Sequence, residues 1–340
     1  MNLDFSNDQK LLQDEASKFL IKEEALKANR AVMETKSNYD PELWQKIVQL
    51  GWTGIRIPEE FGGLGLGHLE LCVIAEELGR QLAPVPFSSS VYLFTEALLE
   101  FASEEQKTQI LPQLVSGEVV GTFAMAETAA APTEQNLVVN YADGKLSGKK
   151  IAVPDAEVAS HAIVVAKENN YATMCLVNLI DASVTVEKQN NIDESRGYFS
   201  IDFKNTPAEI IGDSGSGWLH AEKILNHAAT LFAFEQIGGA QETLDMANAY
   251  AKERYAFGRP IGSFQAIKHK LADMYIALTL AKSNSYYAAW ALSTDAAELP
   301  AAAATARVSA TKAFQLCAQE NIQTHGAVSY THLTLPTSDL

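Results

Sequence analysis

The chain is poor in cysteine, and it lacks apolar segments long enough to cross a bilayer. Its 340 residues include 3 cysteines, Cys72, Cys175 and Cys317, which are scattered along the chain. Cysteine-based zinc sites and redox dithiols need paired spacing, so neither is predicted, and an odd number of thiols favours a reducing compartment. The first ten residues, MNLDFSNDQK, are polar and acidic where a signal peptide would be basic and then apolar. We therefore predict a cytoplasmic protein without a membrane segment.

Lysine and arginine are also scarce relative to the acidic residues. The chain has 26 basic against 42 acidic residues, a formal net charge of -16 and an isoelectric point near 4.9. Such a surface repels phosphate backbones and anionic lipids unless a basic patch intervenes, and no run of Lys and Arg supplies one. Neither nucleic acid nor a membrane is expected as a partner, and no metal site is predicted.

The chain does have ample apolar material, 47% of its residues, and its length favours two or three domains. In the first block, residues 1–118, apolar residues recur at intervals of three and four, which is typical of amphipathic helices. The spacing is clearest in Leu11, Leu12, Ala16, Phe19 and Leu20. A second helix is expected after the Asp40-Pro41 pair, because proline is well tolerated at the first helical position. The first block is predicted to be helical.

The second block, residues 119–213, consists of alternating, β-branched segments broken by turn pairs. Asp143-Gly144 separates NLVVNY from KLSGKK, and Asn169-Asn170 separates AIVVAK from YATMCLVNL. Short polar pairs of this kind connect the strands of hairpins. The block is predicted to be a small antiparallel β domain.

In the third block, residues 214–331, the helical period returns. Three long helices are expected at about residues 218–253, 264–294 and 300–325, and together they form a bundle. The fold class is therefore α+β, with a helical domain, a β domain and a helical bundle in that order. Residues 332–340, HLTLPTSDL, show no helical period and are predicted to be an atypical tail, for which a truncation, a frame shift and a foreign, non-native sequence are the open explanations.

Two motifs carry a resemblance to a known family. GWTGIRIPEEFGGLG at residues 51–65 and RYAFGRPIGSFQAIKH at residues 254–269 resemble signatures of the FAD-dependent acyl-CoA dehydrogenases. In that family, the arginine and glutamine of the second motif reach across a subunit interface to the pyrophosphate and adenosine of the neighbouring chain's FAD. The resemblance nominates Arg254, Phe257 and Gln265 as FAD-binding residues.

The chemistry of the second motif agrees with this assignment. A planar guanidinium makes forked, charge-assisted hydrogen bonds to phosphate, and Gly258 lets the backbone come close to a ligand. The alternative is that Arg254 is a surface ion-pair partner of Asp273 or Glu253.

A third motif, QTHGAVSYT at residues 323–331, resembles the family's element of a glutamine followed by two glycines. The resemblance implies that Gln323 and Gly326 border the adenosine end of the neighbour's FAD, although Ala327 replaces the second glycine. His325 is interpreted as a helix-end histidine beside the carbonyl dipole.

The β domain departs from the family pattern. Where the family holds the flavin ring with a threonine in a Thr-Glu-Pro loop, the segment FAMAETAAAPT has Ala126. Ala131 and Pro132 stand where the family has glycine and serine near the acyl-CoA. On the next strand, Ala152 and Pro154 replace a tryptophan and a threonine. Because these losses fall on the face of the chain's own isoalloxazine, we hypothesise a subunit of a hetero-oligomer that completes its partner's FAD site.

The chemistry implied by the resemblance needs a carboxylate base that removes the substrate's α proton. Some family members place it where this chain has Ala228. Glu235 lies seven residues further along, on the same helical face and within an apolar stretch, where burial would favour its protonated form. Glu235 is therefore the candidate base, and a glutamate paired at the bundle surface is the alternative.

Taken together, the resemblance implies FAD-dependent α,β-dehydrogenation of an acyl-CoA thioester to the trans-2-enoyl-CoA, with electrons passed to electron-transfer flavoprotein. It also implies a homo- or hetero-tetramer with a related subunit. Two alternatives stay open: a non-catalytic partner subunit that completes the FAD site of a second chain, and a flavin monooxygenase or oxidase on the same fold. The identity of the acyl chain cannot be read from the sequence.

Overall fold

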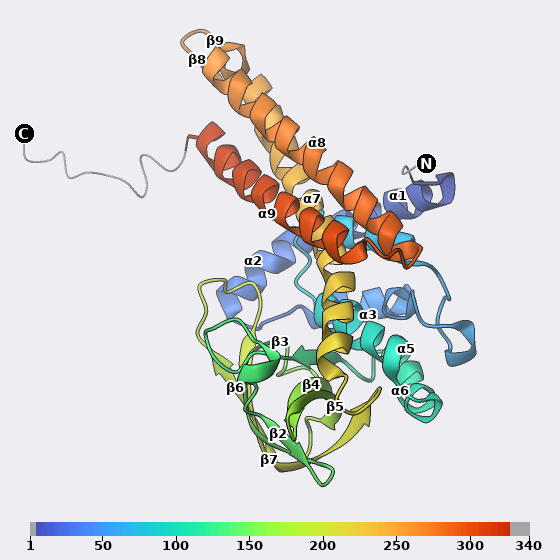
Figure 1. Ribbon diagram of the computed structural model, residues 1–340. Coiled ribbons are helices and arrows are strands. Elements are labelled where there is room, and N and C mark those ends of the chain that lie inside the picture. The colour runs from blue at the N-terminus through green and yellow to red at the C-terminus, as the bar shows by residue number, and fades with distance from the viewer. Residues whose placement is uncertain (1–4, 327–340) are drawn as a thin grey trace, which may run out of the picture. The chain divides into compact units, whose positions relative to one another are not determined.

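The computed structural model describes residues 5–326, so the predicted tail at 332–340 lies outside the described residues (Figure 1). The chain forms two compact units. The helical unit comprises Met1–Leu20, Cys72–Leu82 and Ala229–Leu340, and the mixed unit comprises Ile21–Leu71 and Ala83–Ala228. The two units are defined by which residues contact one another. The predicted domain boundaries at residues 118, 213 and 331 are drawn from the pattern of residue types, and they stay a prediction.

Long helices make up the helical unit. Its elements are α1 (Asn7–Lys22), part of α4 (His68–Arg80), part of α7 (Gly217–Glu253), the hairpin of β8 (Tyr255–Ala256) and β9 (Arg259–Pro260), η5 (Ile261–Ser263), α8 (Gln265–Ser293) and α9 (Leu299–Thr324). The three predicted bundle helices are confirmed to within two residues at each end. Helices α8 and α9 pack against each other, and small buried residues such as Ala288 and Ala303 allow a close approach.

Two glycines allow α4 and α7 to cross with their backbones in contact inside the helical unit. A Cβ atom on Gly79 would lie 2.0 Å from the carbonyl oxygen of Glu235, and one on Gly238 would lie 1.9 Å from the carbonyl oxygen of Glu76. Neither neighbour is a side chain that can rotate away.

We expect Gly238→Ala to lower the free energy of unfolding by about 2 to 3 kcal/mol, because the added methyl group must push two helix backbones apart. Denaturant unfolding measures this loss. Gly239→Ala is the matched control: its Cβ would meet the ring of Phe314 at 2.7 Å, a side chain that can shift, so a loss of about 1 kcal/mol is expected. Equal losses in the two variants would contradict the backbone contact.

The mixed unit combines short helices with a sheet. Its helices are α2 (Ala25–Thr35), α3 (Pro41–Gln49), η1 (Trp52–Gly54), η2 (Glu59–Phe61), η3 (Ser88–Thr95), α5 (Glu96–Phe101), α6 (Glu104–Ser116) and η4 (Glu134–Asn136). The helix expected after the Asp40-Pro41 pair is confirmed as α3. The Asp40 side chain accepts hydrogen bonds from the backbone N–H groups of Glu42 and Leu43, at 2.9 and 3.0 Å, and caps the helix.

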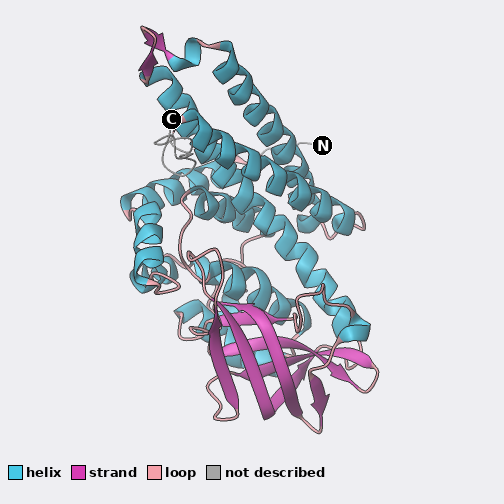
Figure 2. Ribbon diagram, turned by 90° about the vertical axis from the view of Figure 1, so that its left-hand side faces the viewer, coloured by secondary structure: helices cyan, strands magenta, loops and turns pink. Residues whose placement is uncertain are grey.

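Seven strands form the sheet of the mixed unit, drawn in magenta in Figure 2. They are β1 (Gly121–Ala124), β2 (Asn140–Ala142), β3 (Lys145–Pro154), β4 (His161–Glu168), β5 (Tyr171–Asn178), β6 (Val184–Gln189) and β7 (Tyr198–Ile211). The pairings run β1-β4-β2-β3-β7-β5, β4 also pairs with β5, and β6 pairs with β7. The order β4-β2-β3-β7-β5 therefore closes on itself.

Both predicted hairpins are confirmed. Asp143 and Gly144 have φ values of 49° and 74° between β2 and β3, as a two-residue turn requires, and β4 and β5 pair in an antiparallel register from His161↔Asn178 to Glu168↔Tyr171.

The prediction of an antiparallel sheet is corrected at two places. β1 pairs with β4 in parallel from Gly121↔His161 to Ala124↔Val164, and β2 meets β4 in parallel at one position. A parallel pair needs a long connection, so no turn signal reveals it.

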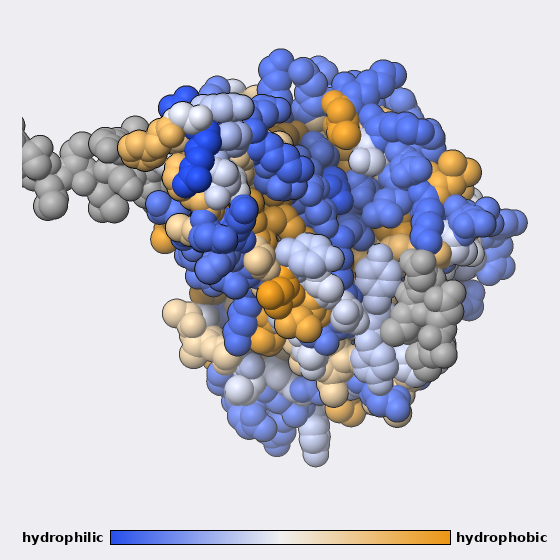
Figure 3. Space-filling model, turned by 90° about the horizontal axis from the view of Figure 1, so that it is seen from above, coloured by the Kyte–Doolittle hydropathy of each residue, from blue (hydrophilic) through white to orange (hydrophobic). Residues whose placement is uncertain are grey.

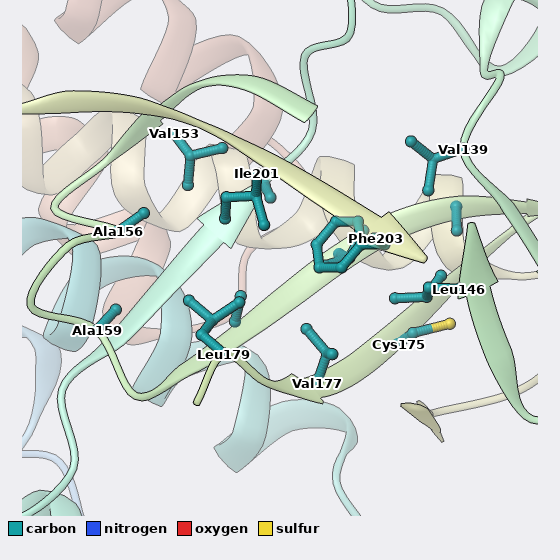
Figure 4. Packing of buried hydrophobic residues seen from close by; sticks show 14 of the residues in the cluster. Val139, Leu146, Val153, Ala156, Ala159, Cys175, Val177, Leu179, Ile201 and Phe203 are labelled. Atoms are coloured by element: carbon teal, nitrogen blue, oxygen red, sulfur yellow. The ribbon is translucent and has the colours of Figure 1, made fainter. Parts of the chain in front are cut away.

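Apolar side chains from the strands fill the interior of the sheet. Figure 4 shows Val153, Ile201 and Phe203 pointing toward Cys175 and Val177 from other strands. Alternate residues of β4 lie in this core, among them Ala162 and Val164, because successive side chains of a strand point to opposite faces. Intervening residues such as Ile163 are buried on the other face, so β4 and β5 are apolar on both faces. Among the described residues, no helix is long and apolar enough to cross a membrane.

Each of the three cysteines, Cys72, Cys175 and Cys317, is buried as a free thiol. Burial, with the Glu168 carboxylate nearby, raises the pKa of Cys175 to about 12, and burial raises the pKa of Cys317 to about 11. We expect native protein at pH 8 to resist iodoacetamide for hours, since about one Cys175 thiol in ten thousand is then ionised. Mass spectrometry should find three modified cysteines after unfolding in guanidinium, and rapid labelling of the native chain would contradict this packing.

Candidate functional site

A two-residue hairpin lies between the end of α7 and the start of α8 in the helical unit (Figure 1). Strands β8 and β9 pair through Tyr255↔Pro260 and Ala256↔Arg259. The turn residues Phe257 and Gly258 have φ values of 53° and 79°, the left-handed backbone that such turns demand. Glycine adopts it without strain, but a bulky aromatic residue does so rarely. Phe257 is also 97% exposed, so the chain by itself buries almost none of this residue.

Arg254 and Gln265 flank the hairpin. The Arg254 N–H donates to the Tyr250 carbonyl and the Arg254 carbonyl accepts from the Ile261 N–H, both at 2.8 Å. Its backbone is therefore fixed while the residue stays exposed. Gln265 is the first residue of α8 and is exposed as well.

One aromatic ring holds the hairpin together. The Arg259 guanidinium lies over the ring of Phe264, 4.1 Å from its centroid, and the Phe257 ring meets the same ring edge-on with centroids 6.3 Å apart. These contacts orient the hairpin against the start of α8. Arg254, Phe257 and Gln265 thus share one exposed end of the helical unit, and their role in binding FAD stays a prediction.

The described part of the third motif, residues 323–326, lies beside the same helices, and Ala327 lies outside the described residues. The His325 ring stacks on the Tyr250 ring with centroids 4.1 Å apart, and its Nδ1 is 2.9 Å from the Asn321 carbonyl oxygen. Lys270 of α8 pairs with Glu320 of α9. Gln323 and Gly326 are exposed at this end of α9. The structure therefore brings two motifs that are about 60 residues apart in sequence to neighbouring positions, and His325 is a helix-end residue as predicted.

A groove of about 370 Å³ runs beside the hairpin. Its lining residues are Asn248, Ala251, Lys252, Pro260, Gly262, Lys268 and Leu271. Two of them are lysines, so together with Arg254 they place positive charge at this end of a chain whose net charge is -16. Local charge of this kind attracts phosphate groups. The face seen from above in Figure 3 is mostly hydrophilic, with small apolar groups.

The loop and strand that the family uses for its own flavin ring carry small side chains here. Ala152 lies in an irregularity of β3 between Lys150 and Val153, with a φ of 51°, and its N–H donates to Gln189 Oε1 at 2.7 Å. The Ile151 N–H donates to the Ala126 carbonyl at 2.8 Å, which joins the loop to the strand. At positions 126 and 152 the edge therefore offers two methyl groups, without a hydroxyl or an aromatic ring.

A buried ion pair that sequence reasoning missed supports this loop. Lys150 is fully buried, and its Nζ donates to Glu127 Oε1 at 2.6 Å and to the Met125 carbonyl at 2.9 Å. Glu127 also accepts hydrogen bonds from the N–H groups of Val138 and Val139, at 2.5 and 3.1 Å. Burial lowers the pKa of Lys150, although Glu127 opposes this shift. Lysine on a strand usually indicates a solvent-facing position, so the sequence gives no signal of the pair.

Glu235 is half-buried on α7, where its backbone lies against Gly79. It precedes the end of α7 at Glu253 by 18 residues, which is about 27 Å along the helix. The structure therefore separates Glu235 from the exposed hairpin. Its role as a base stays a prediction.

A second polar cluster lies in the mixed unit and was also missed. The Glu96 carboxylate is fully buried, with Arg56 Nε 3.1 Å from Oε1 and with His68 Nε2 and His227 Nδ1 at 2.8 and 3.1 Å from Oε2. Burial alone would raise the pKa of Glu96, but the hydrogen bonds from His227 and His68 and the charge of Arg56 hold it well below its usual range. Glu96 is therefore ionised at neutral pH.

Comparison with known proteins places these features in a family. Models described as "Acyl-CoA dehydrogenase, N-terminal domain" and "Acyl-CoA dehydrogenase, C-terminal domain" match residues 6–118 and 215–338. Acyl-CoA dehydrogenase IpdE2 of Mycolicibacterium smegmatis is 30% identical over 329 residues, which cover 96% of this chain and 89% of that protein.

Solved structures of acyl-CoA dehydrogenases and related proteins have a similar fold. Butyryl-CoA dehydrogenase from Megasphaera elsdenii has a TM-score of 0.87 and 26% identity, with 97% of this chain and 91% of the other covered. The ChsE4-ChsE5 complex from Mycobacterium tuberculosis also gives 0.87 and 26%, with 97% and 89% covered.

Proposed function

Since the chain belongs to the acyl-CoA dehydrogenase family, we propose that it is a subunit of an assembly that dehydrogenates an acyl-CoA thioester with FAD. The product is the trans-2-enoyl-CoA, and electron-transfer flavoprotein is the proposed acceptor. When bound, FAD would be the acceptor of the hydride from the β carbon. The chain contributes groups that bind the cofactor and, through Glu235, a base for the α proton.

The observation that carries this proposal is the exposed, strained hairpin. Phe257 combines a left-handed backbone with a 97% exposed ring, and both features are unfavourable in an isolated chain. They become favourable when a neighbouring subunit covers the hairpin. Arg254 and Gln265 then lie at the interface, which is where the family binds FAD.

Each residue at this end has a proposed task. The Arg254 guanidinium would hold the pyrophosphate through forked hydrogen bonds, and the Gln265 amide would bind the adenosine portion. Phe257 would pack against the neighbouring chain. Gln323 and Gly326 would border the adenosine end of the same cofactor. Lys252 and Lys268 of the groove add favourable charge.

We further propose that the assembly is a tetramer containing a second, related chain. The small residues Ala126 and Ala152 support this, because they offer no hydroxyl or stacking ring to a flavin held by this chain. One structural neighbour, the ChsE4-ChsE5 complex, joins two differently named chains. The same two residues favour a second candidate function, a non-catalytic subunit that completes the FAD site of its partner.

Purification of the chain alone and together with a co-encoded relative tests the proposal. We expect little flavin on the isolated chain, and flavin that bleaches on addition of an acyl-CoA in the joint complex. Stoichiometric flavin on the isolated chain would contradict the need for a second subunit. Rapid oxygen consumption with a non-thioester substrate would instead indicate a flavin monooxygenase or oxidase.

A Glu235→Gln variant of the joint complex separates the two candidate roles of this chain. The substitution keeps the size of the side chain but removes its capacity to accept a proton. Loss of flavin bleaching with retained flavin content would support Glu235 as the base. Full bleaching would eliminate that role and favour the partner subunit as the source of the base.

A further inference from the structure

The polar cluster of His68, Glu96 and His227 has no part in the proposed reaction. Its members come from three segments of the mixed unit: the start of α4, the start of α5 and the first half of α7. Glu96 follows η3 directly, and η3 is an eight-residue π-helix, Ser88–Thr95, all of whose residues are buried. π-helical turns are rare and occur frequently at functional sites. The π-helical backbone directly before Glu96 therefore makes this cluster a candidate functional site.

The three ligand-type atoms converge on one point. His68 Nε2 and His227 Nδ1 lie 2.8 and 3.1 Å from Glu96 Oε2, and all three atoms lie within 4.8 Å of one another. Ligands of a tetrahedral zinc ion lie about 2.0 to 2.2 Å from the metal and therefore about 3.3 Å from each other. Outward shifts of about 0.2 to 0.5 Å would bring the two pairs of a histidine nitrogen and Glu96 Oε2 to this spacing. The two imidazole nitrogens, which lie within 4.8 Å of each other, would approach by up to about 1.5 Å.

The imidazole rings are also oriented for such an arrangement. Their planes meet at 81°, with centroids 5.3 Å apart, so the rings are not stacked and each directs one nitrogen toward Glu96. Arg56 Nε binds the other carboxylate oxygen, Oε1, so that Oε2 faces the two imidazole nitrogens alone. A partner of this kind fixes the orientation of a metal-binding carboxylate.

We propose that His68, Glu96 and His227 bind one divalent transition-metal ion of the zinc class. Two imidazole nitrogens and one carboxylate oxygen are a donor set that suits Zn²⁺ and Co²⁺. The ion would take the place of the two N–H protons that point at Oε2, and each neutral imidazole would carry its proton on its other ring nitrogen. The bound ion would link three segments of the chain that are up to 159 positions apart in sequence.

Cobalt binding tests the proposal directly, because four-coordinate Co²⁺ absorbs strongly in the visible range and the hydrated ion does so weakly. The full-length chain, purified without a histidine tag and treated with a chelator, is titrated with Co²⁺. We expect one ion per chain and the intense absorption of a four-coordinate site, in which a water molecule would be the fourth ligand. Zn²⁺ should abolish this absorption and, at a hundred times its dissociation constant, raise the melting temperature by about 4 °C.

Variants assign the signal to the cluster. His227→Gln and Glu96→Gln should each lose the intense absorption, whereas His269→Gln, which changes an exposed histidine of α8, should keep it. Because the buried Glu96 substitution can unfold the chain, His68→Gln is the second test, since the His68 side chain is 11% exposed and lies at the rim of the cluster. Circular dichroism verifies that each variant is folded.

Two outcomes would overturn the proposal. One is wild-type protein that shows only the weak spectrum of hydrated cobalt, which would mean that the cluster is a purely hydrogen-bonded network. The other is equal absorption in wild type and in a folded His68→Gln or His227→Gln variant. None of these measurements involves flavin or acyl-CoA, so the metal site and the proposed function stand or fall separately.

Discussion

Replacing Arg254 with alanine is expected to weaken FAD binding by the joint complex by about 150- to 900-fold. A forked guanidinium–phosphate contact comprises two charge-assisted hydrogen bonds, and their loss corresponds to about 3 to 4 kcal/mol at an interface. The backbone of Arg254 is held by Tyr250 and Ile261, so the substitution removes the charge without releasing the hairpin. Flavin dissociation constants of the complex, obtained from fluorescence titration, measure the effect.

Arg259→Ala is the matched control for charge and position. Arg259 lies on the same hairpin, but its guanidinium is stacked over Phe264. We expect its removal to change flavin affinity by less than about fivefold, since a cation–π contact near the surface contributes about 0.5 to 1 kcal/mol. Equal losses in both variants would mean that the net charge of the hairpin matters and that Arg254 has no specific contact. Unchanged affinity in Arg254→Ala would remove the main support for the proposed function.

Substitution of Lys150 by methionine is expected to lower the free energy of unfolding by about 3 to 5 kcal/mol. The change leaves Glu127 charged and almost buried, with an 8% exposed side chain, after its 2.6 Å partner is gone. Removing both charges is far less harmful, because no uncompensated ion stays inside. The double variant Glu127→Gln with Lys150→Met should therefore recover more than half of the loss, and a double-mutant cycle of unfolding energies measures the coupling.

The pH dependence of the same variant follows from the direction of the Lys150 shift. Burial lowers the folded-state pKa of Lys150 below its unfolded value of 10.5, so the unfolded chain binds more protons between these two pKa values. Stability of the wild type therefore rises with pH in this alkaline window, and the contribution is lost as pH falls through the folded pKa. Lys150→Met lacks this rise, so the stability difference between the two proteins should widen as pH increases. A difference that shrinks would contradict the burial of the charge.

Helix period and turn chemistry were sufficient to predict most of the fold. The three long helices after residue 216 obey local rules, as does the Asp143-Gly144 hairpin, because their apolar spacing and turn residues act within a few positions. The parallel pairing of β1 with β4 obeys no such rule. Its partners, Gly121 and His161, are separated by 40 positions and by another hairpin, so only the folded sheet brings them together.

The candidate site residues also include some that a local motif predicts and others that only the folded chain brings together. Arg254, Phe257 and Gln265 lie within 12 positions of one another, and the continuous motif made them visible. The strain at Phe257 was not visible, since a left-handed turn normally selects glycine, asparagine or aspartate. The pair of Lys150 with Glu127 depends on tertiary packing alone. So does the cluster around Glu96, whose histidines carry none of the spacing by which metal ligands on one helix are recognised.

The closed order of strand pairings has a consequence for how the chain associates with other molecules. Strands β4, β2, β3, β7 and β5 each have neighbours on both sides within the ring, so their backbone groups offer no template to an incoming peptide. Two strands of this sheet lie outside the ring. The residues of β1 are buried, and β6 presents Glu187 and Lys188 as exposed charged residues, which discourage strand addition. We therefore expect little aggregation through strand pairing during expression. Association of the isolated chain with other molecules should involve its helices.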